Sequence, residues 1–336
     1  MTTLNHVSFW AKIVGIGAVA IAATTAVGEA PNLKKLKGTV RIDGSSTVFP
    51  ITEAVAEEFQ SVAPRVRVPV GVSGTGGGFK RFTKGETDIS NASRPIKAKE
   101  YQIAMEKGIE FIEIPVAYDG LSIVVNKNNY WVDSMTVDDL KKIFLDDQAA
   151  TRWSQVRDGW PDIKISVYAP GTDSGTFDYF KEVVAGKTGS IRSDMSVSED
   201  DNVLVNGVSG SEGAIGFFGA AYYFENQEKL KAVPIDGGNG PVVPSKQTIE
   251  SGMYAPFSRP LFIYVNKKSL GRPEVAAYVN FYLEEAAELA EEVGYVRLLQ
   301  AIYDRAAKNV KNGTAGTRYL DKDMEKVHGP LRSIYK

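Results

Sequence analysis

The chain has 336 residues, 43% of them hydrophobic and 24% charged, which is the composition of a soluble globular protein long enough for two domains. Its 39 Lys and Arg residues against 41 Asp and Glu residues give a formal net charge of -2, which excludes a general basic field for nucleic acid. The sequence contains no cysteine, which excludes disulfides, lipid-modified cysteine, thiol catalysis and cysteine metal ligands.

The N-terminal segment differs from the rest of the chain. Residues 13–23 form an apolar run, and no charged residue follows it until Glu29. The run is short for a bilayer span of about 20 residues and is typical of a signal-peptide core, with Ala26 and Gly28 as the small residues before a cleavage site. We predict a signal peptide over residues 1–28 and, because disulfides are absent, export to a bacterial periplasm; an uncleaved N-terminal anchor is the alternative.

From Gly38 onward the pattern alternates between strand and helix. Valines at every second position predict a strand over residues 66–72, and Ile51, Val55 and Phe59 recur every four residues on one face of a helix. Further strands are expected at residues 39–42, 87–90, 111–116, 121–125, 164–168, 214–218 and 230–235, and further helices at residues 97–107, 136–144 and 273–309. A capping box at residues 136–139 is expected to open the second of these helices. This alternation predicts an α/β fold with mainly parallel sheets flanked by helices.

Two distant segments resemble each other. Residues 118–126 and 258–266 are both apolar strands that end on Val-Asn followed by lysine. A pair of matching strands that brackets a long stretch of chain is expected of a two-stranded hinge between domains. We therefore predict one lobe from residues 31–118 plus 259–336 and a second lobe from residues 119–258.

Four short segments rich in glycine and hydroxyl residues each lie between a predicted strand and a predicted helix. They are residues 44–47, 73–78, 92–94 and 172–176. Each would place backbone N–H groups and a Ser or Thr hydroxyl at a helix N-terminus, which is an arrangement that binds oxyanions. Any one of them alone is explained by helix capping. Because ligands bind at the carboxyl ends of strands in such sheets, the four together predict a single anion held by many neutral donors.

Catalysis finds little support in the sequence. The chain has two histidines, His6 in the predicted signal peptide and His328 near the C-terminus, and neither stands in a motif for a Ser-His-Asp triad or a metal site. The glycine-rich loop is not a P-loop, because it lacks the spacing and the Ser or Thr after Lys80. We predict that the protein is not an enzyme and uses no cofactor and no metal.

Four motifs together resemble the periplasmic phosphate-binding proteins of ABC importers, which are class II periplasmic binding proteins. The motifs are Gly-Ser-Ser-Thr-Val-Phe-Pro at residues 44–50, Ser-Gly-Thr-Gly-Gly-Gly at 73–78, Ala-Ser-Arg-Pro at 92–95 and Asp-Ser-Gly-Thr-Phe at 173–177. The resemblance spans residues 38–266 with the motifs in the order and spacing of that family. It implies two α/β lobes that are joined by two extended strands and close on the ligand.

The resemblance also implies that all four loops supply phosphate ligands, most of them hydroxyls or backbone N–H groups. The implied ligands are Ser46, Thr47, Val48 N–H, Phe49 N–H, Ser73, Thr75, Gly76 N–H, Ser93, Arg94, Ser174, Gly175 N–H and Thr176. Pro170 stands where the best-known members have an arginine, and Ser93-Arg94 stand where some members have an aspartate. We interpret Arg94 as the compensating positive charge. Asp173 is the candidate acceptor for the phosphate proton, with helix capping or orientation of Arg94 as its alternative role.

The sequence thus predicts an exported, monomeric receptor that binds inorganic phosphate between its lobes and delivers it to the membrane permease of an ABC importer. Three alternatives stay open at this point. One is a receptor for another tetrahedral oxyanion such as sulfate, the second is a secreted phosphate-ester hydrolase that uses a loop serine, and the third is a surface scaffold or adhesin.

Overall fold

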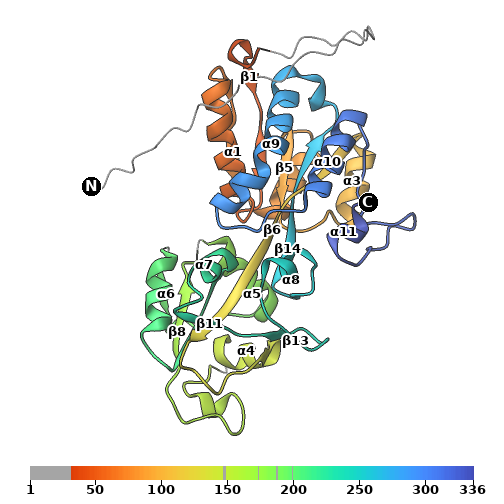
Figure 1. Cartoon of the computed structure of the whole chain (residues 1–336). Helices are drawn as coiled ribbons and strands as arrows, with labels where there is room; N and C mark the ends of the chain where they lie inside the picture. Colours follow the sequence, from red (N-terminus) through yellow and green to blue (C-terminus); the bar gives the residue numbers. More distant parts are fainter. Residues whose placement is uncertain (1–31, 147–148, 173, 187, 199) are drawn as a thin grey trace, which may run out of the picture. The chain divides into compact units, whose positions relative to one another are not determined.

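The computed structural model describes residues 32–146, 149–172, 174–186, 188–198 and 200–336, so the predicted signal peptide lies outside the described residues. One long strand, β6 (Phe111–Asn126), is buried along its whole length and extends through both halves of the described fold (Figure 1). Strand β14 (Ser258–Asn266) runs antiparallel beside it and pairs Arg259 with Asp119. The two segments that resemble each other in the sequence therefore meet at their starts, where residues 258–260 pair with residues 118–120, and the rest of β14 pairs with residues 111–117 of β6.

Lobe I and lobe II are the names used here for the parts on either side of this pair of strands. In lobe I the sheet order is β4-β2-β5-β14-β6, and in lobe II it continues through β10, β8 and β9, with β11 also on β6. The bounds are β2 (Ile42–Gly44), β4 (Val70–Val72), β5 (Ile89–Ala92), β8 (Ser166–Pro170), β9 (Ser196–Ser198), β10 (Ala214–Gly219) and β11 (Leu230–Ala232). The outer strands are parallel, as predicted. Strands β14 and β6 are antiparallel to their neighbours, because the chain leaves lobe I along β6 and comes back beside it along β14.

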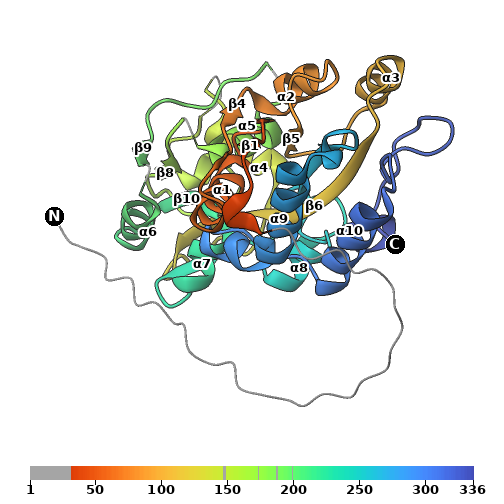
Figure 2. The same ribbon diagram turned by 90° about the horizontal axis from the view of Figure 1, so that it is seen from above.

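Helices cover both halves of this sheet (Figures 1 and 2). They are α1 (Phe49–Val62), α2 (Gly74–Phe82), α3 (Ala98–Glu106), α4 (Val137–Phe144), α5 (Gly175–Val184), α6 (Asp201–Ser209), α7 (Ala220–Glu225), α8 (Lys246–Glu250), α9 (Pro273–Glu292), α10 (Gln300–Asn312) and α11 (Leu331–Ile334). Short strands complete the fold, namely β1 (Gly38–Thr39), β3 (Val66–Arg67), β7 (Met135–Thr136), β12 (Ile235–Asp236) and β13 (Pro241–Val242).

The predicted amphipathic helix after the first loop is confirmed as α1. Its apolar face is fully buried, and the ring of Phe59 meets that of Tyr278 on α9 edge to face at a centroid distance of 5.3 Å. The capping box predicted at residues 136–139 is also confirmed, because Asp139 N–H donates to the Thr136 hydroxyl at 3.1 Å and Thr136 N–H donates to the Asp139 carboxylate at 3.0 Å.

The predicted helix over residues 273–309 was wrong in one respect, since it is interrupted between α9 and α10. Gly294 takes a φ of 84°, a left-handed conformation that ends a helix readily when the residue is glycine. Val296 then exchanges two backbone hydrogen bonds with Tyr118 on β6, at 2.8 and 3.0 Å. Pairing with the hinge strand thus replaces a helical turn, which periodicity along the chain does not reveal.

Helix α2 lies very close to the end of β2, and this approach depends on a missing side chain. A Cβ atom on Gly78 would lie 2.6 Å from Gly44 Cα and 2.9 Å from Ser90 Oγ. Both distances are shorter than a carbon atom tolerates, so α2 can pack this closely on β2 and β5 only if residue 78 is glycine.

We predict that Gly78→Ala lowers the free energy of unfolding by about 1–3 kcal/mol, because the added methyl group forces α2 away from β2. Urea denaturation measures the change. Gly76→Ala is the matched control in the same helix, since a Cβ atom at that position would have no atom within 4 Å, and it should stabilise by about 0.5–1 kcal/mol through helix propensity. Equal effects of the two substitutions would contradict the close approach.

Candidate anion-binding site

A cavity of about 230 Å³ lies where the first three loops, helix α5 and strand β14 meet. Its lining is dominated by hydroxyl and charged side chains. The lining residues are Ser45, Ser46, Thr47, Gly74, Thr75, Ser93, Arg94, Asp178, Tyr179, Glu182 and Arg259. Residues of both lobes and of the hinge therefore surround one small polar space.

The first loop forms a tight turn between β2 and α1. Ser45 N–H donates to Asn91 O at 3.0 Å, and the Ser45 carbonyl accepts hydrogen bonds from Val48 N–H at 3.2 Å and from Phe49 N–H at 3.1 Å. The resemblance to phosphate-binding proteins implied that the N–H groups of Val48 and Phe49 hold the anion. In this structure they close the first turn of α1, and neither residue lines the cavity.

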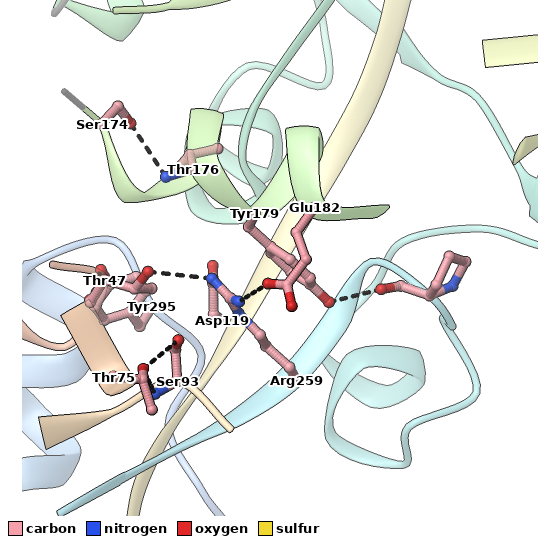
Figure 3. Close-up of polar contacts among 11 residues, drawn as sticks. Thr47, Thr75, Ser93, Asp119, Ser174, Thr176, Tyr179, Glu182, Arg259 and Tyr295 are labelled. Atoms are coloured by element: carbon pink, nitrogen blue, oxygen red, sulfur yellow. Dashed lines mark hydrogen bonds and ion pairs between the residues drawn. The ribbon is translucent and has the colours of Figure 1, made fainter. Parts of the chain in front are cut away.

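Thr47 is the residue of the first loop at which the two lobes meet. It is buried, and its hydroxyl accepts a hydrogen bond from Arg259 Nη2 at 3.1 Å, while its carbonyl accepts one from the Tyr295 hydroxyl (Figure 3). Gly175, at the start of α5, packs directly against it, since a Cβ there would lie 2.8 Å from Thr47 Cα. Glycine at this position therefore allows lobe II to approach the first loop.

The second and third loops contribute a pair of hydroxyls. Thr75 Oγ1 and Ser93 Oγ lie 3.1 Å apart, and Ser93 N–H donates to Thr75 Oγ1 at 3.1 Å (Figure 3). Both residues belong to the predicted ligand set, and both line the cavity. Ser73 and Gly76 do not line it, because the first turn of α2 directs only part of the loop toward the cavity.

Arg94 lines the cavity, but its guanidinium is already paired. Nη1 and Nη2 donate to the two carboxylate oxygens of Glu100 at 2.9 and 2.7 Å, in a forked ion pair. The guanidinium carbon also lies 5.5 Å from the centroid of the Phe79 ring. The charge that the sequence assigned to an incoming anion is therefore partly neutralised by a carboxylate of the same lobe.

Arg259 is a second cation in the cavity lining, and sequence reasoning missed it. Its Nε donates to Asp119 at 3.2 Å, its Nη1 lies 3.4 Å from Glu182, and its guanidinium carbon sits 3.7 Å from the centroid of the Tyr179 ring (Figure 3). Together with its bond to Thr47, these contacts connect the hinge with both lobes. The side chain of Arg259 is only 14% exposed, so packing against these neighbours fixes its position.

Burial sets the protonation of the groups around Arg259. Burial raises the pKa of the Asp119 carboxyl, and the adjacent guanidinium of Arg259 opposes that rise. Burial also raises the pKa of the Tyr179 phenol, which donates its proton to Pro256 O at 2.7 Å. Tyr179 thus stays neutral at physiological pH and acts as a flat surface for the guanidinium.

The fourth loop approaches the cavity differently from the prediction. Ser174 Oγ accepts a hydrogen bond from Thr176 N–H at 3.2 Å, so it caps α5, and none of Ser174, Gly175 and Thr176 lines the cavity. Helix α5 instead reaches the cavity with the residues of its next turn, which are Asp178, Tyr179 and Glu182. Asp173, the predicted proton acceptor, lies outside the described residues.

One signal in the sequence could have identified Arg259. The two segments that resemble each other carry Asp119 and Arg259 near their starts, and these are direct partners in the antiparallel register of β6 and β14. Opposite charges at facing positions of two apolar strands indicate a buried ion pair. A ligand set drawn only from the glycine-rich loops leaves this pair out.

Within the described ranges, no group of three or more His, Cys, Asp and Glu side chains is arranged to hold a metal ion. The same ranges contain no helix that is both long and apolar enough to cross a bilayer.

We predict that Arg259→Met lowers the free energy of unfolding by about 3–5 kcal/mol, because it leaves the buried carboxylate of Asp119 without its charge partner. Adding Asp119→Asn should recover at least half of that loss, since the unpaired charge is then removed. Urea denaturation of the two variants measures both effects. The control is Arg152→Met, which breaks the exposed pair with Asp162 and should cost less than about 1 kcal/mol. A double variant no more stable than Arg259→Met alone would contradict the buried pair.

Comparison with known proteins places the chain in a family. Residues 13–286 match the model of a PBP superfamily domain. The chain is 50% identical over 303 residues to protein SphX of Synechococcus elongatus, with 89% of each chain covered. It is 40% identical over 280 residues to the phosphate-binding protein PstS of Staphylococcus haemolyticus, with 83% of this chain and 87% of that protein covered.

A solved structure agrees with these sequence relatives. The crystal structure of a possible phosphate-binding protein from Planctomyces limnophilus matches with a TM-score of 0.81 at 48% identity, covering 83% of this chain and all of that one. The two-lobe α/β fold expected from the four motifs is confirmed by this match. The chain therefore belongs to the PBP superfamily, within the family of phosphate-binding proteins that its motifs resemble.

Proposed function

We propose that the protein is an exported receptor that binds inorganic phosphate in the cavity between its lobes and delivers it to the membrane permease of an ABC importer. The observation that carries the proposal is the cavity of about 230 Å³, which hydroxyls from three loops line together with two arginines. Its volume is below the range of about 300–1,000 Å³ that is typical of sites for larger organic ligands. A small tetrahedral anion fits such a space.

The chemistry of the lining suits an anion that has lost its water. Burying an anion is costly unless its oxygens receive hydrogen bonds, and each charge-assisted bond contributes about 1.5–3 kcal/mol. We assign the role of direct ligands to the cavity-lining members of the predicted set. These are the hydroxyls of Ser46, Thr47, Thr75 and Ser93 and the guanidinium of Arg94, to which the structure adds Arg259.

The proposed lobes follow the predicted boundaries, with lobe I from residues 31–118 plus 259–336 and lobe II from residues 119–258. Strands β6 and β14 connect them, so that flexing near their crossing would open the cavity. The close packing of Gly175 on Thr47 supports a closed arrangement of the loops around the site. We further propose that residues 1–28 direct export and that the mature protein acts as a monomer without enzymatic turnover.

Calorimetry of the protein lacking residues 1–28 tests the proposal directly. We predict binding of phosphate and arsenate and no turnover of a chromogenic phosphate ester. Thr75→Val and Ser93→Ala should each weaken phosphate binding by about tenfold or more, which is about 1.4 kcal/mol, because each removes one hydroxyl donor.

Thr188→Val is the control for these variants, because Thr188 is exposed and does not line the cavity. It should leave phosphate affinity unchanged. Wild-type affinity in both the Thr75 and Ser93 variants would refute the proposed site, and clear hydrolysis of the ester would refute a purely receptor function.

Discrimination between phosphate and sulfate requires an acceptor for the proton that phosphate carries at neutral pH. The candidate carboxylates are Asp173 from the fourth motif and Asp178 and Glu182 in the cavity lining. We predict that changing one of the three to its amide raises sulfate affinity by about tenfold or more and weakens phosphate binding. Calorimetry of Asp173→Asn, Asp178→Asn and Glu182→Gln with both anions measures this, with Glu228→Gln as an exposed control. Unchanged sulfate exclusion in all three variants would show that no carboxylate among them determines selectivity.

A further inference from the structure

A groove of about 410 Å³ lies on lobe I between helices α2 and α3, which are both labelled in Figure 2. Ile103 forms its apolar floor, since Phe79, the other apolar lining residue, is only 1% exposed, and Gly76 adds no side chain to the lining. The side chain of Ile103 is 36% exposed, which is a high exposed fraction for an isoleucine. The groove is distinct from the anion cavity, and none of the four sequence motifs accounts for its apolar character.

Five exposed lysines surround this apolar floor. They are Lys80 and Lys84 from α2 and the turn after it, and Lys97, Lys99 and Lys107 from α3 and its two ends. Their aliphatic chains extend the apolar surface while their ammonium groups remain in water. The positive charge of the groove is thus concentrated at its edge.

The charge of these lysines is largely uncompensated. Lys84 lies 3.8 Å from Glu86, whereas no described carboxylate lies within 4.0 Å of the ammonium groups of the other four. Among the described lining residues only Glu100 is acidic, and both of its oxygens already accept hydrogen bonds from Arg94. A protein with a formal net charge of -2 therefore presents one strongly positive, partly apolar hollow.

We propose that this groove is a docking site for an acidic amphipathic segment of a partner protein. An apolar side chain of the segment would enter the hollow between α2 and α3, and flanking Asp or Glu residues would face the lysines. Apolar anchors in a pocket supply most of the affinity of such contacts, and complementary charge at the rim supplies specificity and a fast encounter.

The shape of the groove favours a protein segment over an anionic membrane surface. A lipid bilayer is contacted best by a convex or flat face whose apolar side chains project outward. Here Ile103 lines a groove between two helices. An inserted side chain reaches Ile103, whereas a plane of headgroups contacts mainly the lysines.

Synthetic peptides of designed composition test the proposal. Three fluorescein-labelled 16-residue amphipathic helices would share one stripe of Leu and Phe, with Glu, Gln or Lys at all other positions. Fluorescence anisotropy with the mature protein should give the Glu peptide at least tenfold tighter binding than the Gln peptide, and no binding of the Lys peptide. The affinity for the Glu peptide should fall as salt is raised, because the rim contacts are exposed and screened.

Variants of the groove make the test specific. Lys97→Glu with Lys99→Glu should weaken Glu-peptide binding at least tenfold, and Ile103→Ser should do the same by removing the apolar floor. The double variant should fold, because acidic residues at the start of α3 interact favourably with the helix dipole. Lys308→Glu with Lys311→Glu on α10 is the matched control, since both lysines are exposed and lie outside the groove lining.

The outcomes separate the proposal from its rivals. Tight binding of the Glu peptide that the groove variants abolish and the α10 control retains would support it. Equal binding of the Glu and Gln peptides, equal loss in the groove and control variants, or no peptide binding would overturn it. Anionic phosphatidylglycerol vesicles that bind through Lys97 and Lys99 while the Glu peptide does not would likewise overturn it in favour of a membrane contact. All of these measurements are made without phosphate, so their outcome does not depend on whether the protein binds it.

Discussion

The ion pair between Arg259 and Asp119 is the contact on which the arrangement of the site depends. The two residues face each other on β14 and β6, where the strands pass between the lobes. Taking such charges out of water is expensive, and the expense is offset only when the geometry satisfies both groups. Arg259 meets this condition with four partners, since it also contacts Thr47, Glu182 and Tyr179. Because these partners belong to both lobes, satisfying one buried charge also holds the first loop against α5.

Ion pairs between arginine and carboxylate side chains also determine the electrostatics of the cavity. Both arginines in its lining already have carboxylate partners, Glu100 for Arg94 and Asp119 for Arg259. An anion in the proposed site would therefore meet no uncompensated positive charge among the described lining residues, and we propose that directed hydrogen bonds from hydroxyls would hold it. Hydrogen bonds of this kind demand a defined geometry. Such a site favours one shape and protonation state of ligand, and it avoids the very strong attraction that two unpaired guanidinium groups would exert on any anion.

The sequence predicted those features that arise from local patterns. The apolar period of Ile51, Val55 and Phe59 predicted α1, the Thr136 capping box predicted the start of α4, and the repeated Val-Asn ending predicted the hinge strands. Three of the four glycine-rich loops line the cavity, and their role as anion ligands stays a prediction. The signals for α1 and α4 succeed because each depends on residues that are close together in the chain, whereas the hinge strands were found by comparing two distant segments.

Side-chain orientation could not be predicted in the same way. Whether the N–H of Val48 faces a ligand or the Ser45 carbonyl, and whether Ser174 faces the cavity or caps α5, is decided by the backbone conformation of a single turn. The guanidinium of Arg94 turns to Glu100 because a helix N-terminus six residues later presents a carboxylate there. Arg259 belongs to the site through the pairing of strands that are far apart in sequence, which no local pattern records.

The ion pair of Arg94 and Glu100 also joins two surfaces of lobe I. Arg94 lines the anion cavity, and Glu100 lines the lysine-edged groove. Any ligand that draws the guanidinium away from Glu100 leaves an additional negative charge beside the lysines, and this charge opposes an acidic segment. Thermodynamic linkage makes the effect reciprocal, so that an acidic segment in the groove must weaken such a ligand by the same factor. If instead the anion binds while the pair stays intact, the two surfaces are independent. The position of one guanidinium therefore decides whether the two sites are coupled.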